Sequence, residues 1–257
     1  MAKVKVKAID HGEEITLVDH LDELRSRIIT SLMIFGAALA LCFWQNKVLL
    51  DIANGPLPGG REPITFGVAE PFTTTLTIAA YGAILLSLPA LLYQAYSFVL
   101  PALKPTEKKT VMPFLLMAPF LFVAGVVFAY FVVVPAATDF LLNFNDDQFN
   151  IQIRAREYYS FFAMALISVG VLFQIPTGIL AVTRLGIATP NQIAANRRYA
   201  VLGIAVLAML LPGTDPVTML LSMAPLIVLF EGSLVLARVL APKEKTAETP
   251  SAPPAGA

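Results

Sequence analysis

The chain has 257 residues, of which 57% are hydrophobic and only 14% are charged, and its mean hydropathy is +0.72. This composition is too apolar for a soluble domain whose surface must face water, and it predicts an integral membrane protein. The formal net charge is zero, which argues against the usual basic class of polyanion-binding proteins.

A charged segment comes before the first apolar run. Residues 1–27 carry six acids and five bases and contain no apolar core, so we expect no cleavable signal peptide. Leu17, Leu21 and Leu24 of this segment and Ile28, the first residue of the apolar run, recur at helical spacing. The pattern predicts an amphipathic helix that runs directly into the first membrane span.

Four charge-free runs are each long enough to cross a bilayer of about 30 Å as a helix. They are residues 28–46, 71–103, 110–138 and 158–183. Two further runs, 199–211 and 217–230, would each cover only about 20 Å as helices, and the turn "PGTDP" separates them. A carboxylate belongs at the interface or in water, so Asp215 in this turn favours two short helices over one broken helix. The sequence therefore predicts an all-α membrane protein with six spans, of which the fifth and sixth are short.

The distribution of basic residues predicts the orientation. Of the 18 Lys and Arg residues, 14 fall in the N-terminal segment, the second and fourth connections and the tail, and four fall in the other connections. This asymmetry predicts that both termini lie in the cytoplasm. We expect a flexible N-terminus at 1–15, a single membrane domain at 16–240 and a disordered tail at 241–257. The weak alternation within the outer connection 141–157 suggests a short strand or cap.

Several prolines lie inside the apolar runs, where each removes a backbone hydrogen bond and favours a kink. They are Pro89, Pro119, Pro176 and Pro225. Together they predict kinked, tilted helices that form a concave scaffold. The alternative is that these prolines are ordinary features of membrane helices, because neighbouring groups can satisfy the freed carbonyls.

Two polar side chains lie at depth in the predicted spans. Gln174 either serves a carbonyl freed by Pro176 or contacts a ligand or partner, and the sequence leaves both interpretations open. Glu231 should face protein or reach toward the inner interface, because a carboxylate in the bilayer costs about 2.5–3.5 kcal/mol on insertion scales.

The residues of the usual catalytic sites are missing from the spans. Both histidines, His11 and His20, lie in the N-terminal segment, and the single cysteine, Cys42, cannot form an intramolecular disulfide. We therefore expect no enzyme activity, no metal site and no cofactor.

Acidic residues on the basic cytoplasmic face indicate a possible binding site. Glu23 lies four residues before Arg27 in "HLDELRSR", and Glu107 follows the second span. One interpretation is a solvated helix with an internal ion pair, which contributes only about 0.3–0.5 kcal/mol. The other is that the two carboxylates receive a cationic ligand, for which guanidinium groups are the best match.

The chain resembles the TatC family over about residues 16–240. The motifs that carry the resemblance are "HLDELRSR", "GPLP", "EPFTT", "LYQAYSFVLPALKPTEKK", "FAYFVVVP", "SFFAMALISVGVLFQIP" and "PLIVLFE", which occur in this order. In combination they are highly specific.

The resemblance implies the receptor core of the twin-arginine translocase, which exports folded proteins across a bacterial inner membrane using the proton-motive force. Implied partners are TatA- and TatB-type single-span proteins, other copies within a multi-subunit complex, and the twin-arginine signal peptides of precursors. Implied signal-peptide residues are Glu23, Glu107, Arg25, Arg27, Phe98, Leu103 and Lys104. Outer-side residues for assembly or transport would be Pro56, Phe72 and Asp215, and Gln174 and Glu231 would be polar partner contacts.

The sequence departs from the family pattern at two places. Gln174 stands where many relatives have Glu, so it retains hydrogen bonding without the charge. The fifth turn reads "LLPGTDP" in place of the family's "TPPD" form, which weakens the equivalence of Asp215. Two other functions remain in view, namely a small-solute transporter or channel that uses Gln174 and Glu231, and a scaffold without substrate contact.

Overall fold

The structure is a computed structural model of the chain, and it describes residues 17–99, 105–184, 187–209 and 216–240. Helices dominate these residues, and an isolated parallel bridge between Ile64 and Arg154 is the β-pairing present among them. The helices are α1 (Leu17–Trp44), α2 (Asn46–Asn54), α3 (Glu70–Val99), α4 (Pro105–Phe128), α5 (Val134–Asn143), α6 (Ala155–Leu172), α7 (Ile175–Arg184), α8 (Pro190–Ala195), α9 (Arg197–Met209) and α10 (Pro216–Leu240). A 3-10 turn at Pro58–Gly60 and a π-helical turn at Ala129–Val133 complete the set.

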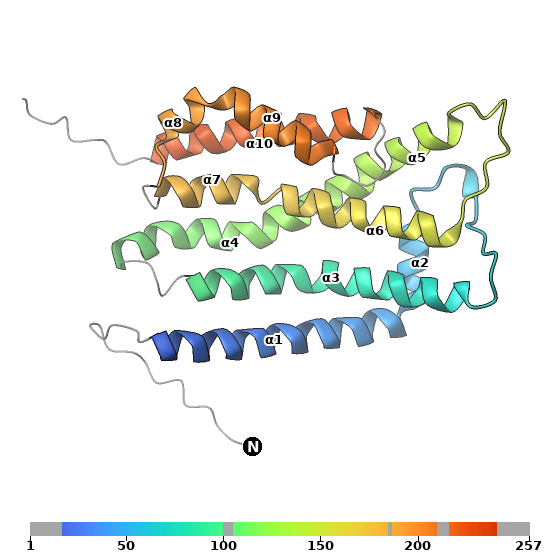
Figure 1. Cartoon of the computed structure of the whole chain (residues 1–257), viewed down its shortest axis with the longest axis horizontal. Coiled ribbons are helices and arrows are strands. Elements are labelled where there is room, and N and C mark those ends of the chain that lie inside the picture. Colours follow the sequence, from blue (N-terminus) through green and yellow to red (C-terminus); the bar gives the residue numbers. More distant parts are fainter. Residues whose placement is uncertain (1–16, 100–104, 185–186, 210–215, 241–257) are drawn as a thin grey trace, which may run out of the picture.

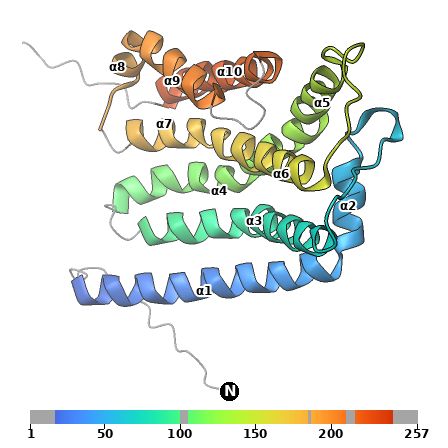
Figure 2. The same cartoon turned by 45° about the vertical axis from the view of Figure 1, so that its right-hand side comes forward.

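The long helices lie side by side in a row. From one edge to the other, the order is α1, α3, α4, the bent pair α6–α7, and finally α9 with α10, and it is the same in both views (Figures 1 and 2). One end of the row carries α2 and the connections at 55–69 and 144–154, and we call it the α2 end. The opposite end carries α8 together with the first residues of α1 and α4, and we call it the α8 end.

Five stretches of the described residues are long and apolar enough to cross a bilayer. They are Leu21–Trp44, Glu70–Phe98, Leu116–Asn143, Ala155–Thr183 and Met219–Val239. They agree with the first four predicted spans and with the sixth. The predicted helix before the first span is present, because α1 runs without a break from Leu17 into that span, while its amphipathic character stays a prediction.

The region of the fifth and sixth predicted spans contains two separate helices, as expected. α9 has only 13 residues, so the described part covers about 20 Å, and the six-span count stays a prediction. The sixth helix is longer than the sequence suggested, because α10 continues past Glu231 to give 25 residues. Glu231 is tolerated inside this helix because its carboxylate is paired with Arg197 of α9, at 3.2 Å.

Of the four prolines inside the apolar runs, Pro176 lies at a break between two helices, and the other three lie inside helices that continue past them. Helices α3 and α10 continue through Pro89 and Pro225, and α4 continues through Pro119. The break between α6 and α7 comes just before Pro176, which then occupies the first turn of α7, where a missing N–H costs little. A second irregularity is the π-helical turn, which immediately precedes α5 and its Pro135.

The centre of the row is held by a close crossing of α4 and α6 at two glycines. A Cβ added at Gly125 would lie 2.9 Å from the Cα of Gly170 and 2.7 Å from the ring of Phe173. A Cβ at Gly170 would lie 2.7 Å from the ring of Phe122, which is 1% exposed. Small residues allow membrane helices to approach in this way, since packing rather than the hydrophobic effect holds them together.

We expect Gly125→Ala to destabilise the protein by about 1–3 kcal/mol, because backbone and a buried ring must move to admit the methyl group. The measurement is thermal unfolding of the purified protein in detergent. Gly178→Ala is the matched control, since its Cβ would meet nothing within 4 Å. Equal melting temperatures for the two variants would contradict the importance of the crossing.

Candidate functional site

At the α8 end, an acid and a base of α1 form an ion pair, and the base also bonds to α3. The Nε and Nη2 atoms of Arg27 both donate to Oε1 of Glu23, and the Nε bond is 2.9 Å long. The Nη1 atom of Arg27 donates to Oε1 of Gln94 on α3, at 3.1 Å. The Arg27 and Glu23 side chains are 24% and 29% exposed, so the pair is half-buried and still reachable.

This pair lies at one end of an open groove between α1 and α3. The groove has a volume of about 590 Å³ and is mainly apolar. Its lining residues are Leu24, Arg27, Ile28, Ser31, Leu32 and Phe35 of α1 and Leu91, Gln94, Ala95 and Phe98 of α3. A ligand with a cationic group followed by an apolar segment would match this arrangement, in which a carboxylate adjoins an apolar groove.

Gln174 connects the bent helix α6–α7 to α4. Its Nε2 donates to the carbonyl of Ala118 at 3.1 Å, so the amide serves a neighbouring helix rather than a carbonyl near Pro176. Its Oε1 is buried and has no hydrogen-bond partner among the described residues. An unpaired buried acceptor is costly, so a donor at this oxygen would be stabilising.

At the α2 end, three tyrosines hold the last turn of α2. The hydroxyls of Tyr130 and Tyr158 donate to the carbonyls of Ile52 and Ala53, at 3.1 and 2.6 Å. The hydroxyl of Tyr159 lies 3.0 Å from Oδ1 of Asn54. Helix ends leave carbonyls without intrahelical partners, and these tyrosines supply donors where a water molecule would otherwise be needed.

A second network at this end is centred on Glu70, the first residue of α3. Its Oε2 accepts the backbone N–H groups of Phe66 and Gly67 at 2.9 and 3.2 Å, and its Oε1 accepts Nε of Arg154 at 2.8 Å. Arg154 also reaches Glu157 at 3.4 Å and lies over the ring of Phe66. Hydrogen bonding and charge from Glu70 raise the pKa of the Arg154 guanidinium above its ordinary value.

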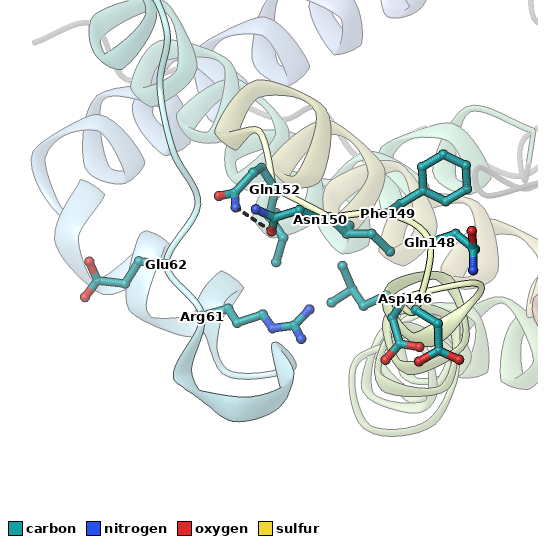
Figure 3. A pocket seen from close by; sticks show the side chains of 11 residues that line it. Arg61, Glu62, Asp146, Gln148, Phe149, Asn150 and Gln152 are labelled. Carbon is teal, nitrogen blue, oxygen red and sulfur yellow. Dashed lines mark hydrogen bonds between the residues drawn. The ribbon is translucent and has the colours of Figure 1, made fainter.

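The same end contains a polar pocket of about 740 Å³. Figure 3 shows that Arg61 points across it toward Asp146, while Glu62 points away. Its other wall is the segment 147–153, in which Gln152 donates to Asn150 at 3.1 Å. Among the described residues, no group of three or more His, Cys, Asp and Glu side chains could hold a metal ion.

Comparison with known proteins decides the family. The model of the family "Sec-independent protein translocase protein (TatC)" matches residues 19–225. The Sec-independent protein translocase protein TatC of Carboxydothermus hydrogenoformans is 37% identical over 235 residues, covering 91% of this chain and 97% of that protein. The chain belongs to the TatC family.

Further matches agree with this assignment. The chloroplastic TATC of Oryza sativa subsp. japonica is 36% identical over 222 residues, which cover 86% of this chain and 62% of that longer protein. A crystal structure of the twin arginine translocase receptor TatC in DDM matches with a TM-score of 0.74 and 31% identity, covering 85% of this chain and 99% of that one. The chain is therefore a multi-pass membrane protein and a component of the Sec-independent, twin-arginine protein translocase.

Family membership removes the support for a small-solute transporter, because TatC is a protein translocase component. Glu231, which that alternative used as a midplane ligand, is paired with Arg197. The two side chains are 39% and 51% exposed, so the pair lies on the outside of the α9–α10 layer.

The structure gathers part of the site expected for a TatC chain at the α8 end. Glu23, Arg27 and Phe98 line or adjoin the groove, and Arg25 is exposed on the same helix turn. Glu107 lies in the first turn of α4, which begins at the same end, but its side chain is outside those described (Figure 1). Leu103, Lys104 and Asp215 lie outside the described residues, as do 1–15 and 241–257.

Pro56 and Phe72, which the sequence predicts for the outer side, both lie at the α2 end. Pro56 follows the α2 helix that the tyrosines hold, and its carbonyl is 3.4 Å from the hydroxyl of Thr138. Phe72 is 64% exposed in the first turn of α3, next to Glu70. In place of the suggested strand, the connection 141–157 forms the isolated bridge, in which Ala155 N–H donates to the Ile64 carbonyl at 2.9 Å.

Sequence reasoning missed Gln94, Glu70 and Arg154. Glu70 and Arg154 both stand at the start of an apolar span, and charges of opposite sign at such positions are a signal for pairing across the interface. Gln94 gives no such signal, because a single amide near the end of a span has many possible partners.

We expect Glu70→Gln to lower the melting temperature clearly, because the amide would turn an N–H group toward donors that now meet a carboxylate. The matched control is Glu157→Gln, which changes the other carboxylate on Arg154. Its side chain is 74% exposed, so little change is expected. If the two variants melt together, the network at Glu70 does not stabilise this end.

Proposed function

We propose that this chain is the receptor core of the twin-arginine translocase. In this role the α8 end faces the cytoplasm of a bacterial cell, with both termini inside, and binds the twin-arginine signal peptides of folded precursors. The chain then works in the inner membrane with TatA- and TatB-type single-span partners and uses the proton-motive force. The excess of basic residues in the connections at the α8 end supports this orientation.

One observation carries the proposal. The Glu23 carboxylate accepts two N–H groups from a guanidinium in the structure, and it does so at the end of an apolar groove. A signal peptide has a cationic segment followed by about 7–15 apolar residues, which is the order of groups that this site would accept. The matched crystal structures carry the description of a twin arginine translocase receptor, which is consistent with the same role here.

In the proposed site, Glu23 and Glu107 bind the two arginines, while Arg25, Arg27, Phe98, Leu103 and Lys104 surround or orient that site. Pro56, Phe72 and Asp215 would support assembly or transport on the outer side. Gln174 and Glu231 would contact the helices of the single-span partners. The unpaired Oε1 of Gln174 supports this last assignment, since a partner hydroxyl or amide would satisfy it.

We expect the double variant Glu23→Gln, Glu107→Gln to bind a twin-arginine peptide about tenfold more weakly or worse, because two charge-assisted hydrogen-bond acceptors are lost. The measurement is fluorescence anisotropy of a labelled peptide with the full chain in lipid nanodiscs. Asp146→Gln at the α2 end serves as a control acid-to-amide change far from the groove. Unchanged affinity in the double variant would reject the site.

The Gln174 assignment has its own test. We expect Gln174→Leu to reduce site-specific cross-linking of the chain to a TatA- or TatB-type partner, while peptide binding in nanodiscs stays normal. Gln174→Glu should retain the cross-link, because the carboxyl group can still accept a hydrogen bond. Full cross-linking in Gln174→Leu would show that the amide is only a link between α7 and α4.

A further inference from the structure

The carboxylate proposed as receptor already holds a guanidinium that belongs to the chain itself. Arg27 donates from Nε and Nη2 to one oxygen of Glu23, from one helical turn away on α1. A guanidinium of a ligand would use the same carboxylate as its acceptor. An incoming arginine therefore meets an acceptor that is occupied.

A second contact holds Arg27 from the other side. Its Nη1 donates to Oε1 of Gln94, which lies on α3 across the groove. All three nitrogens of the guanidinium thus have acceptors, and the side chain is fixed between α1 and α3. Gln94 carries no charge, so it can hold Arg27 without competing for a cationic ligand.

The hold on Arg27 is weak enough to be broken. The pair is about a quarter exposed, and charge pairs at this helical spacing and exposure contribute little to stability. When a ligand needs the same carboxylate, its apparent affinity equals its intrinsic affinity multiplied by the fraction of molecules in which Arg27 does not occupy that carboxylate. The internal pair therefore lowers every guanidinium ligand's affinity by one common factor.

We propose that Arg27 is an internal competitor for Glu23, and that Gln94 retains it in the competing position. The proposal rests on the proposed function. It means that a ligand must bind strongly enough to displace Arg27 before it occupies the site. A ligand that brings two adjacent arginines displaces Arg27, whereas a weaker cationic segment at the same concentration does not. Arg27 is then a regulator of occupancy and not a group that strengthens binding.

The test compares variants that remove or weaken the contact of Arg27 with Glu23, with and without a change of charge. Arg27→Gln removes the competitor, and Gln94→Leu removes only its support, at constant net charge. We expect both to bind labelled Arg-Arg and Lys-Lys peptides more tightly than the wild type, by roughly two- to fivefold for Arg27→Gln and by less for Gln94→Leu. The two peptides should gain by a similar factor, as a common competitor requires.

The probe is the full chain in lipid nanodiscs, with affinity and association rate read by fluorescence anisotropy. Arg238→Gln is the charge-matched control, because it removes one positive charge near the end of α10, which also ends at the α8 end. It should leave both affinities unchanged. Elution volume and helical circular dichroism report folding, and if Arg27→Gln fails to fold, Gln94→Leu decides the question.

Each other result overturns the inference. Weaker or unchanged peptide binding in Arg27→Gln would mean that Arg27 positions Glu23 or touches the peptide itself. Tighter binding in Arg27→Gln without any gain in Gln94→Leu would mean that only the charge matters. These outcomes differ from failure of the proposed function, in which the wild type binds the Arg-Arg peptide no better than the Glu23→Gln, Glu107→Gln variant.

Discussion

Hydrocarbon offers no hydrogen-bond partner, so a chain with several membrane spans must satisfy its own polar groups. Several polar contacts in this structure meet that requirement. Tyrosine hydroxyls serve the last carbonyls of α2, Arg197 neutralises Glu231, and Arg154 joins two backbone N–H groups at Glu70. Among the described side chains, the requirement is not met at Oε1 of Gln174 or at the hydroxyls of Thr74, Thr177 and Ser222.

The two ends of the row meet this constraint in different ways. At the α2 end, polar contacts join segments that are far apart in sequence, such as Tyr158 to Ala53 and Arg154 to Glu70. Beside the groove at the α8 end, Arg27 instead pairs with Glu23 of its own helix and donates one bond across to Gln94 of α3. Long-range contacts make a rigid cap, while a local pair is easily exchanged. The proposed receptor role, in which a peptide must be admitted and released, would need the second kind of contact beside the groove.

Much of the fold could be predicted from the sequence, because hydropathy and charge act along the chain. The apolar runs located the long helices, and the spacing of Leu17, Leu21 and Leu24 predicted the entry into α1. The same reasoning could not tell which prolines break a helix, since α6 and α7 separate at Pro176 while Pro89 and Pro225 lie in continuous helices. Whether a proline breaks a membrane helix depends on neighbouring groups that satisfy the freed carbonyl, and these belong to other segments.

The candidate site shows the same division. Glu23 and Arg27 could be paired from their spacing alone, because four residues make one helical turn. Gln94 could not be found, since its role depends on how α1 packs against α3. The same holds for Gln174, where the sequence allowed a local partner near Pro176 and the structure has Ala118 of α4 instead.

The π-helical turn at Ala129–Val133 has a consequence for the face that α5 presents. A π-turn adds one residue to a helix, and each residue of an α-helix advances by about 100° around its axis. Everything after the turn is therefore rotated by nearly a third of a circle relative to an uninterrupted helix. That rotation brings Thr138 within reach of Pro56 and lets Val134 and Ala137 pack inward. The number of residues between α4 and α5 thus sets which side chains of α5 face the protein. A one-residue insertion or deletion there would therefore disturb the packing at the α2 end more than most substitutions.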